Sequence, residues 1–139
     1  MLVNLLKKYF NTESAEVLAG FFLEKEYVKD SILFKVNEES KKELYFILDG
    51  IVDFYLTKNG NEKKIASATV GDFFGELSFI DGLPRSATAV AKTDLKVGIF
   101  SRDNFMKLKA DNLNIYVELL EVLLKILSAK IRKIDEEQL

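Results

Sequence analysis

The chain of 139 residues contains neither histidine nor cysteine. It therefore cannot form thiol nucleophiles, histidine-based catalytic triads, disulfides or the common kinds of zinc site. A cupin-like enzyme on a β-barrel would also need histidine ligands for its metal. An enzyme that uses carboxylates alone stays open, but nothing in the sequence favours one. We therefore expect a protein that is not an enzyme and has no metal site.

Long hydrophobic runs are also absent. No segment holds eighteen consecutive apolar residues, so we expect no membrane-spanning helix. The N-terminal segment 1–8 is apolar before its two lysines and lacks the basic start and cleavage site of a signal peptide. The lack of cysteine fits a reducing compartment. Together these features predict a cytoplasmic location and no membrane partner.

Neither sign of charge dominates, since the net charge is −2. Nucleic-acid-binding domains usually have a basic face, so we expect no nucleic-acid binding by this chain alone. Hydrophobic residues make up 48% of the chain and charged residues 30%, a balance typical of globular proteins. The length suits one domain with its own core, predicted to span residues 1–139.

The periodicity of the apolar residues changes twice along this domain. Residues 1–24 have helical spacing and predict short N-terminal helices. Residues 25–101 contain short alternating segments separated by turn residues, which predicts an antiparallel β-roll or jelly-roll barrel. Residues 102–139 return to helical spacing and predict C-terminal helices, the last one long. The predicted fold class is thus mainly β with flanking helices.

Local signals place some of the element boundaries. Thr12 or Ser14 is the expected start of the second helix, which would include Phe21 and Phe22. The pair Asp49-Gly50 predicts a tight hairpin between two strands, because glycine readily adopts positive φ. A second turn is predicted at residues 59–61, and Asp111 or Asn112 is the expected N-cap of the last helix.

The stretch from 74 to 89, called the cassette below, carries the most specific chemistry. Gly75 allows close approach of the backbone to a ligand and can start a helical turn whose N–H groups favour negative charge. Arg85 is one of three arginines among twenty basic residues, and its planar guanidinium can hold two phosphate oxygens. Glu76 offers a carboxylate acceptor for a sugar hydroxyl. The cassette predicts a ligand with a sugar and one phosphate.

The cassette closely resembles the phosphate-binding cassette of cyclic nucleotide-binding domains, a family that includes catabolite-activator-type regulators and the regulatory subunit of cyclic-AMP-dependent kinase. The resemblance implies that Gly75 and Glu76 hold the ribose 2′-hydroxyl and that Arg85 holds the cyclic phosphate. A looser likeness covers roughly residues 15–137. The implied ligand-binding residues are Phe74, Gly75, Glu76, Leu77, Ser78, Arg85, Ser86 and Ala87.

The same resemblance implies cyclic AMP as the ligand, with cyclic GMP as the alternative. In the family, serine or threonine after the arginine can favour guanine, but several cyclic AMP binders also have serine, so Ser86 leaves the choice open. No Thr-Ser pair near residues 134–139 identifies the cap over the base. The loop before Leu44 lacks the glycines common in the family, although Asn37 tolerates positive φ.

The last helix has an apolar seam whose members are spaced alternately by four and three residues, as in a coiled coil. These residues are Leu113, Val117, Leu120, Leu124, Leu127, Ile131 and Ile134. We expect the first half of the helix to pack on its own domain and the second half on a partner helix, where Lys130 can meet Asp135 of the other chain. The alternative is a helix folded entirely onto its own domain.

The sequence as a whole predicts a regulatory module that binds a cyclic nucleotide and signals by moving its C-terminal helix within a homodimer or against a partner. The alternative is a dimerisation or docking domain that has the same fold and uses no ligand.

Overall fold

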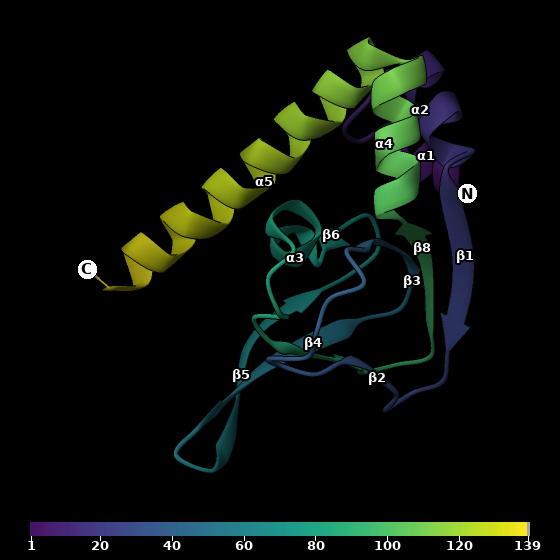
Figure 1. Cartoon of the computed structure of the whole chain (residues 1–139). Helices are drawn as coiled ribbons and strands as arrows, with labels where there is room; N and C mark the ends of the chain where they lie inside the picture. The colour runs from purple at the N-terminus through teal and green to yellow at the C-terminus, as the bar shows by residue number, and fades with distance from the viewer. Residues whose placement is uncertain (139) are drawn as a thin grey trace.

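The computed structural model describes residues 1–138; Leu139, the end of the predicted domain, lies outside them. Helices stand at both ends of the chain and strands lie between them, as predicted (Figure 1). The elements are α1 Leu2–Leu6, α2 Thr12–Ala19, β1 Phe22–Tyr27, β2 Ile32–Phe34, β3 Leu44–Asp49, β4 Val52–Lys58, β5 Asn61–Ala68, β6 Phe73–Phe74, α3 Glu76–Asp81, β7 Thr88–Ala91, β8 Leu95–Phe100, α4 Arg102–Asp111 and α5 Leu113–Gln138.

The strands form two antiparallel sheets of four strands each. One sheet has the order β1-β8-β3-β6 and the other β2-β7-β4-β5. The predicted turn at residues 59–61 is confirmed, because β4 and β5 pair as a hairpin in which Lys58 lies opposite Asn61. The predicted antiparallel β-roll with flanking helices is therefore the observed fold.

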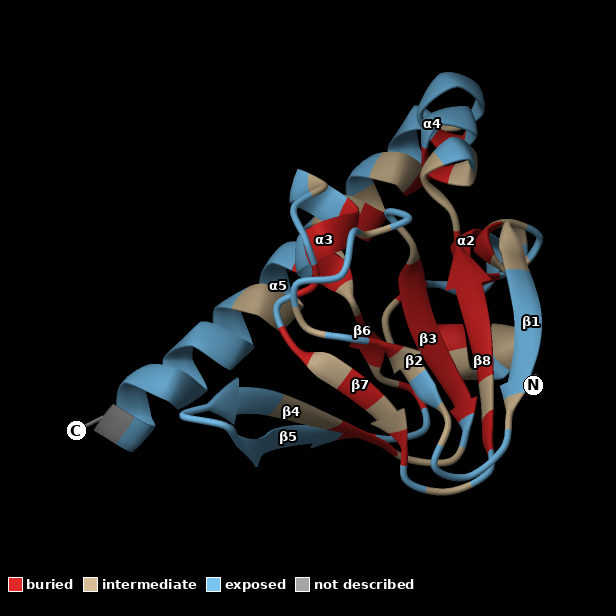
Figure 2. Ribbon diagram, turned by 60° about the horizontal axis from the view of Figure 1, so that its bottom comes forward, coloured by how far each residue is buried: buried red, intermediate tan, exposed pale blue. Residues whose placement is uncertain are grey.

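Strand β3 is buried on both faces (Figure 2). Successive side chains of a strand point to opposite faces. Leu44, Phe46 and Leu48 pack into a core shared with the helices. Tyr45 and Ile47 face the other way, into the core between the two sheets. The central strand thus joins the helical layer to the interior of the roll.

One boundary near the N-terminus differs from that predicted. Helix α2 ends at Ala19, and Phe22 belongs to β1, where it lies opposite Phe100 of β8. The predicted start of this helix at Thr12 is confirmed. Asn11 is the N-cap, and its side chain accepts a hydrogen bond from the Ser14 amide at 2.8 Å. An asparagine just before the helix supplies the acceptor that a first-turn N–H needs.

The hairpin predicted at Asp49-Gly50 is wrong as well. Strands β3 and β4 belong to different sheets, so the chain crosses from one sheet to the other at this point. The turn still requires glycine: Gly50 has φ +100°, and a Cβ there would lie 2.4 Å from the Asp94 carbonyl oxygen. The Asp-Gly pair indicated a sharp change of chain direction, but it did not indicate which strand β4 would pair with.

Helix α5 begins after Asn112, one of the two predicted N-caps, whose side chain accepts from the Ile115 amide at 3.4 Å. Its buried residues Ile115, Leu119 and Leu123 pack into the helical core. The Ser14 hydroxyl donates to the Glu118 carboxylate at 2.6 Å, which ties α2 to α5. The C-terminal half of α5 extends beyond the helical layer and has an exposed surface (Figures 1 and 2).

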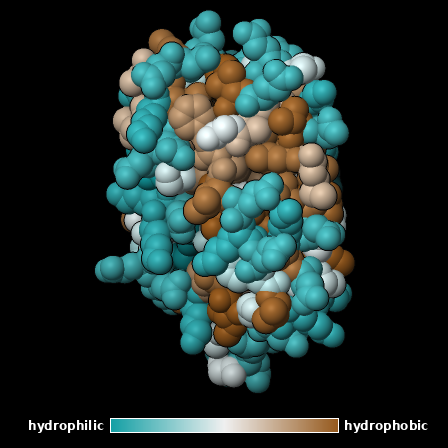
Figure 3. All heavy atoms as spheres, turned by 90° about the vertical axis from the view of Figure 1, so that its right-hand side faces the viewer, coloured by the Kyte–Doolittle hydropathy of each residue, from teal (hydrophilic) through white to brown (hydrophobic). Residues whose placement is uncertain are grey.

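The helical layer is not fully covered by polar side chains. Figure 3 shows apolar atoms gathered on the upper part of the face that carries α2, α4 and β1. Val17, Phe21 and Phe22 are only half-buried, and Leu23 is exposed. Within residues 1–138, none of the helices has both the length and the apolar character needed to cross a bilayer.

The two glycine turns on either side of β4 allow a matched test of the crowding at Gly50. Gly60 also has positive φ, at +80°, but a Cβ there meets no atom within 4 Å. We expect Gly60→Ala to lower the free energy of unfolding by about 1 kcal/mol through backbone strain alone. Gly50→Ala adds a backbone collision and should cost about 3 kcal/mol or more. Urea denaturation measures both; equal losses would contradict the close approach of the Asp94 carbonyl to Gly50.

Candidate functional site

The cassette starts where β6 ends and the chain turns into α3. Gly75 is the N-cap of α3 and has φ +78°, a conformation that glycine adopts without strain. A Cβ at this position would lie 2.9 Å from Nη1 of Arg85 and 3.3 Å from the Tyr45 ring. Only glycine lets the arginine approach so closely. The predicted start of a helical turn at Gly75 is confirmed.

The Arg85 side chain is held inside the domain, and the residue is 4% exposed. Its Nη1 donates to the Gly75 carbonyl at 3.3 Å and its Nη2 to the Glu43 carbonyl at 3.2 Å. The guanidinium carbon lies 4.2 Å from the centre of the Phe34 ring and 5.7 Å from that of Tyr45. These carbonyls and aromatic faces stabilise a cation that has left water.

The loop between β2 and β3 fixes the backbone of the same arginine. The Arg85 amide donates to the Glu38 carbonyl at 2.9 Å, and its carbonyl accepts from the Asn37 amide at 2.8 Å. Asn37 has φ 67°, and Lys42 at the far end of the loop has φ 58°. Asparagine tolerates this conformation, so the loop makes the turn without the family's glycines.

Burial shifts the ionisation of two groups here. It lowers the pKa of Arg85, while Tyr45 and the carboxylates of Glu43, Glu38 and Glu76 act in the opposite direction. Arginine nevertheless stays protonated at any physiological pH. Burial, with a further contribution from the Glu43 carboxylate, raises the pKa of the Tyr45 phenol. The site thus presents one permanent positive charge beside a neutral aromatic ring.

Glu76 is the first residue of α3, and its side chain is 5% exposed. Its carboxylate forms an ion pair with the ammonium of Lys130, which comes from α5. The sequence predicted that Lys130 would meet Asp135 of a partner helix; in the described chain its partner is Glu76. No local pattern indicates this contact, because 54 positions separate the two residues.

The other predicted site residues differ in their exposure. Phe74 is buried in the core between the sheets, where its ring stacks on Tyr45 at 4.8 Å. Ser78 is also buried, and its carbonyl accepts from the Gly82 amide at 2.9 Å. Leu77 and Ser86 are exposed, and Ala87 is buried at the approach to β7. The side chains of Leu77 and Ser86 thus reach the surface, whereas the ring of Phe74 is enclosed in the core.

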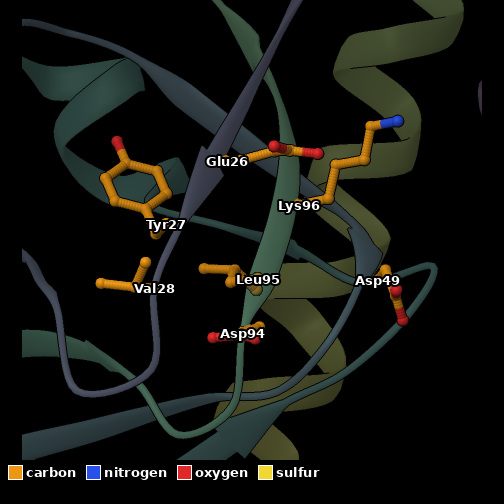
Figure 4. Close-up of a pocket in the computed structure, with 7 residues that line it drawn as sticks. All are labelled: Glu26, Tyr27, Val28, Asp49, Asp94, Leu95 and Lys96. Atoms are coloured by element: carbon orange, nitrogen blue, oxygen red, sulfur yellow. The ribbon is translucent and has the colours of Figure 1, made fainter.

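A separate hollow of about 350 Å³ lies at the other end of β3. Figure 4 shows Glu26 and Lys96 at this hollow, with Asp49 near its edge. No cassette residue lines it. The Arg85 site adjoins Glu43 at the start of β3, whereas the hollow adjoins Asp49 at its end. The site and the hollow are therefore distinct.

Comparison with known proteins assigns the family. The family model described as "Cyclic nucleotide-binding domain" matches residues 24–112, well over half of the chain. The chain belongs to the cyclic nucleotide-binding domain family. The match includes the whole cassette and the loop that holds Arg85, but Lys130 lies beyond it.

Relatives of this cyclic nucleotide-binding domain occur in fungi and bacteria. The cAMP-dependent protein kinase regulatory subunit of Candida albicans is 32% identical over 105 residues, which are 76% of this chain and 22% of that protein. The chain thus spans about a fifth of that relative's length. A cyclic nucleotide-binding domain from Methylobacillus flagellatus superposes with a TM-score of 0.88 at 28% identity, covering 95% of this chain and 77% of that one. The catabolite activator protein of Thermus thermophilus gives 0.82 at 25% identity, covering 96% and 61%.

Proposed function

We propose that this domain is a regulatory module that binds cyclic AMP and signals through its C-terminal helix. The observation that carries the proposal is the fixed, buried guanidinium of Arg85, together with the buried carboxylate of Glu76 that acts on its charge. A guanidinium has five N–H donors, and two are engaged by the carbonyls of Gly75 and Glu43. The others make no hydrogen bond within the described residues, and a phosphate suits their planar arrangement.

In this proposal the cyclic phosphate lies against Arg85. The residues after it, Ser86 and Ala87, are small, so their amides and the Ser86 hydroxyl can add donors to the phosphate. The ribose 2′-hydroxyl donates a hydrogen bond to Glu76, because an ionised carboxylate can only accept. Gly75 allows the ligand to approach the backbone at the start of α3.

Cyclic AMP is proposed over cyclic GMP because a relative that covers three quarters of this chain is named as the regulatory subunit of a cAMP-dependent kinase. Ser86 does not decide between the two purines, and cyclic GMP remains the alternative. The proposal includes no catalysis, since the site's charged groups hold a ligand rather than transfer a proton or a nucleophile. The predicted cytoplasmic location stays a prediction.

The signal is proposed to pass through α5 and a homodimer. Leu124 is 64% exposed and Ile131 is 58% exposed, and Ile134 is exposed further along the same seam. An apolar seam with this spacing is typical of a helix that pairs with another. Ligand binding can move α5 only if the domain binds the ligand more tightly with the helix in one position than in another.

The ligand site is tested by replacing its arginine. We expect Arg85→Ala to weaken cyclic AMP binding by about 3–5 kcal/mol, or roughly two to three and a half decades, since it leaves a phosphate without its partner. Isothermal titration calorimetry measures this loss, with cyclic GMP titrated in parallel to establish the purine preference. Arg85→Lys keeps the charge without the planar donors and should also bind more weakly than the wild type.

The exposed Arg132 on α5 provides a matched control, and Arg132→Ala should bind as the wild type does. Urea denaturation establishes that each variant is folded. Binding of Arg85→Ala within threefold of the wild type would defeat the proposed site. If millimolar cyclic AMP and cyclic GMP both fail to raise the melting temperature of the wild type, the ligand-free docking domain is favoured instead.

The dimer is tested on the exposed seam of α5. The double variant Leu124→Glu/Ile131→Glu should weaken dimerisation by at least about two decades, because it would bury unpaired carboxylates between the helices. Ala129→Glu, at an exposed position outside the seam, should leave the dimer intact. Analytical ultracentrifugation measures all three proteins. A wild type that sediments as a monomer, with and without cyclic AMP, would refute the homodimer.

A further inference from the structure

An ion pair between Glu76 and Lys130 joins the cassette to α5. The two side chains differ greatly in exposure: that of Glu76 is 5% exposed and that of Lys130 is 51% exposed. A carboxylate withdrawn from water needs a compensating charge or donors. Lys130 meets this need from a helix that contributes no other residue to the predicted site.

Glu76 poses an electrostatic difficulty for a phosphate ligand. The carboxylate that is suited to the ribose hydroxyl also repels the phosphate, which is to lie nearby on Arg85. The hydroxyl is neutral and cannot offset this charge. With Arg85 and Glu76 alone, the site would have no net charge for an anionic ligand. Lys130 gives the three side chains a net charge of +1, which matches the single negative charge of a cyclic phosphate.

The carboxylate can serve both partners. It has two oxygens with about four acceptor positions, and the ammonium of Lys130 contacts Oε1. Oε2 remains available for a hydroxyl, so binding of the ribose does not require the ion pair to break. The ammonium also has three donors, of which the carboxylate needs one.

We infer that Lys130 is a positioning residue of the ligand site, contributed by α5, whose ammonium offsets the charge of Glu76 so that this carboxylate accepts the ribose hydroxyl beside the phosphate. The inference rests on the proposed function. It extends the site beyond the cassette and makes the position of α5 part of ligand affinity. By linkage, bound ligand must then favour the position of α5 in which Lys130 contacts Glu76.

A double-mutant cycle tests this role by calorimetry with cyclic AMP, on the wild type, Lys130→Met, Glu76→Gln and the double variant. Loss of a hydrogen bond to a charged group typically lowers affinity about tenfold or more. The half-exposed Lys130 lies at the low end of that range. We therefore expect Lys130→Met to weaken binding about tenfold. In the Glu76→Gln background the same change should alter affinity by less than about twofold, because no carboxylate charge remains to be offset.

Lys125→Met serves as the matched control, since Lys125 lies on an exposed part of the same helix. It should bind as the wild type does. A loss that is equally large in both backgrounds would show that Lys130 acts by stabilising the helix and would overturn the inference. So would a Lys130→Met variant that binds as tightly as the wild type, or more tightly. These outcomes leave the proposed function intact, whereas a wild type that binds no cyclic nucleotide overturns both.

Hydrogen exchange provides the second readout. In the wild type, cyclic AMP should slow exchange of the α5 amides around Lys130, because ligand and ion pair reinforce one another. In Lys130→Met, saturated with cyclic AMP, this protection should be lost while the amides of the cassette stay protected. Equal protection of α5 in the two proteins would contradict the link between the helix and the site.

Discussion

The buried guanidinium of Arg85 imposes the main constraint on this domain. A charge withdrawn from water must be compensated where it lies, and several distant segments meet that need. The backbone carbonyls of Gly75 and Glu43 accept hydrogen bonds from the guanidinium. Phe34 supplies an aromatic face, and the loop after it fixes the backbone. The arginine is therefore in place as part of the fold, and a ligand need not order it.

Strand β3 is buried on both faces and links the site to both the core between the sheets and the core under the helices. Glu43, which precedes the strand, contacts Arg85, and Tyr45 lies beneath the guanidinium. On its other face, Leu44 and Phe46 pack into the same core as the first half of α5. The Glu76–Lys130 ion pair gives the second half of α5 a direct contact with the cassette. The site and the helix are thus connected twice, by apolar packing and by charge.

The sequence predicted the features that depend on local chemistry. Gly75 at a helix start, Arg85 among small residues and the β4–β5 hairpin follow from residue types at short spacing. The predictions were wrong where one sequence pattern is compatible with two different structures. Asp49-Gly50 marks a sharp turn, but the chain crosses between sheets there. Phe22 fits helical spacing, but it pairs with β8. The roles of Phe34 and Lys130 depend on contacts between residues far apart in the chain, which no local pattern encodes.

The central claim is that Arg85 and Glu76 bind the two ends of one ligand, the phosphate and the ribose. A crystal structure of the domain with cyclic AMP tests it most directly. The account predicts the cyclic phosphate within hydrogen-bonding distance of the Arg85 guanidinium and the ribose 2′-hydroxyl on the Glu76 carboxylate. A nucleotide located instead in the hollow near Glu26 and Lys96, or one whose phosphate makes no contact with Arg85, would contradict it.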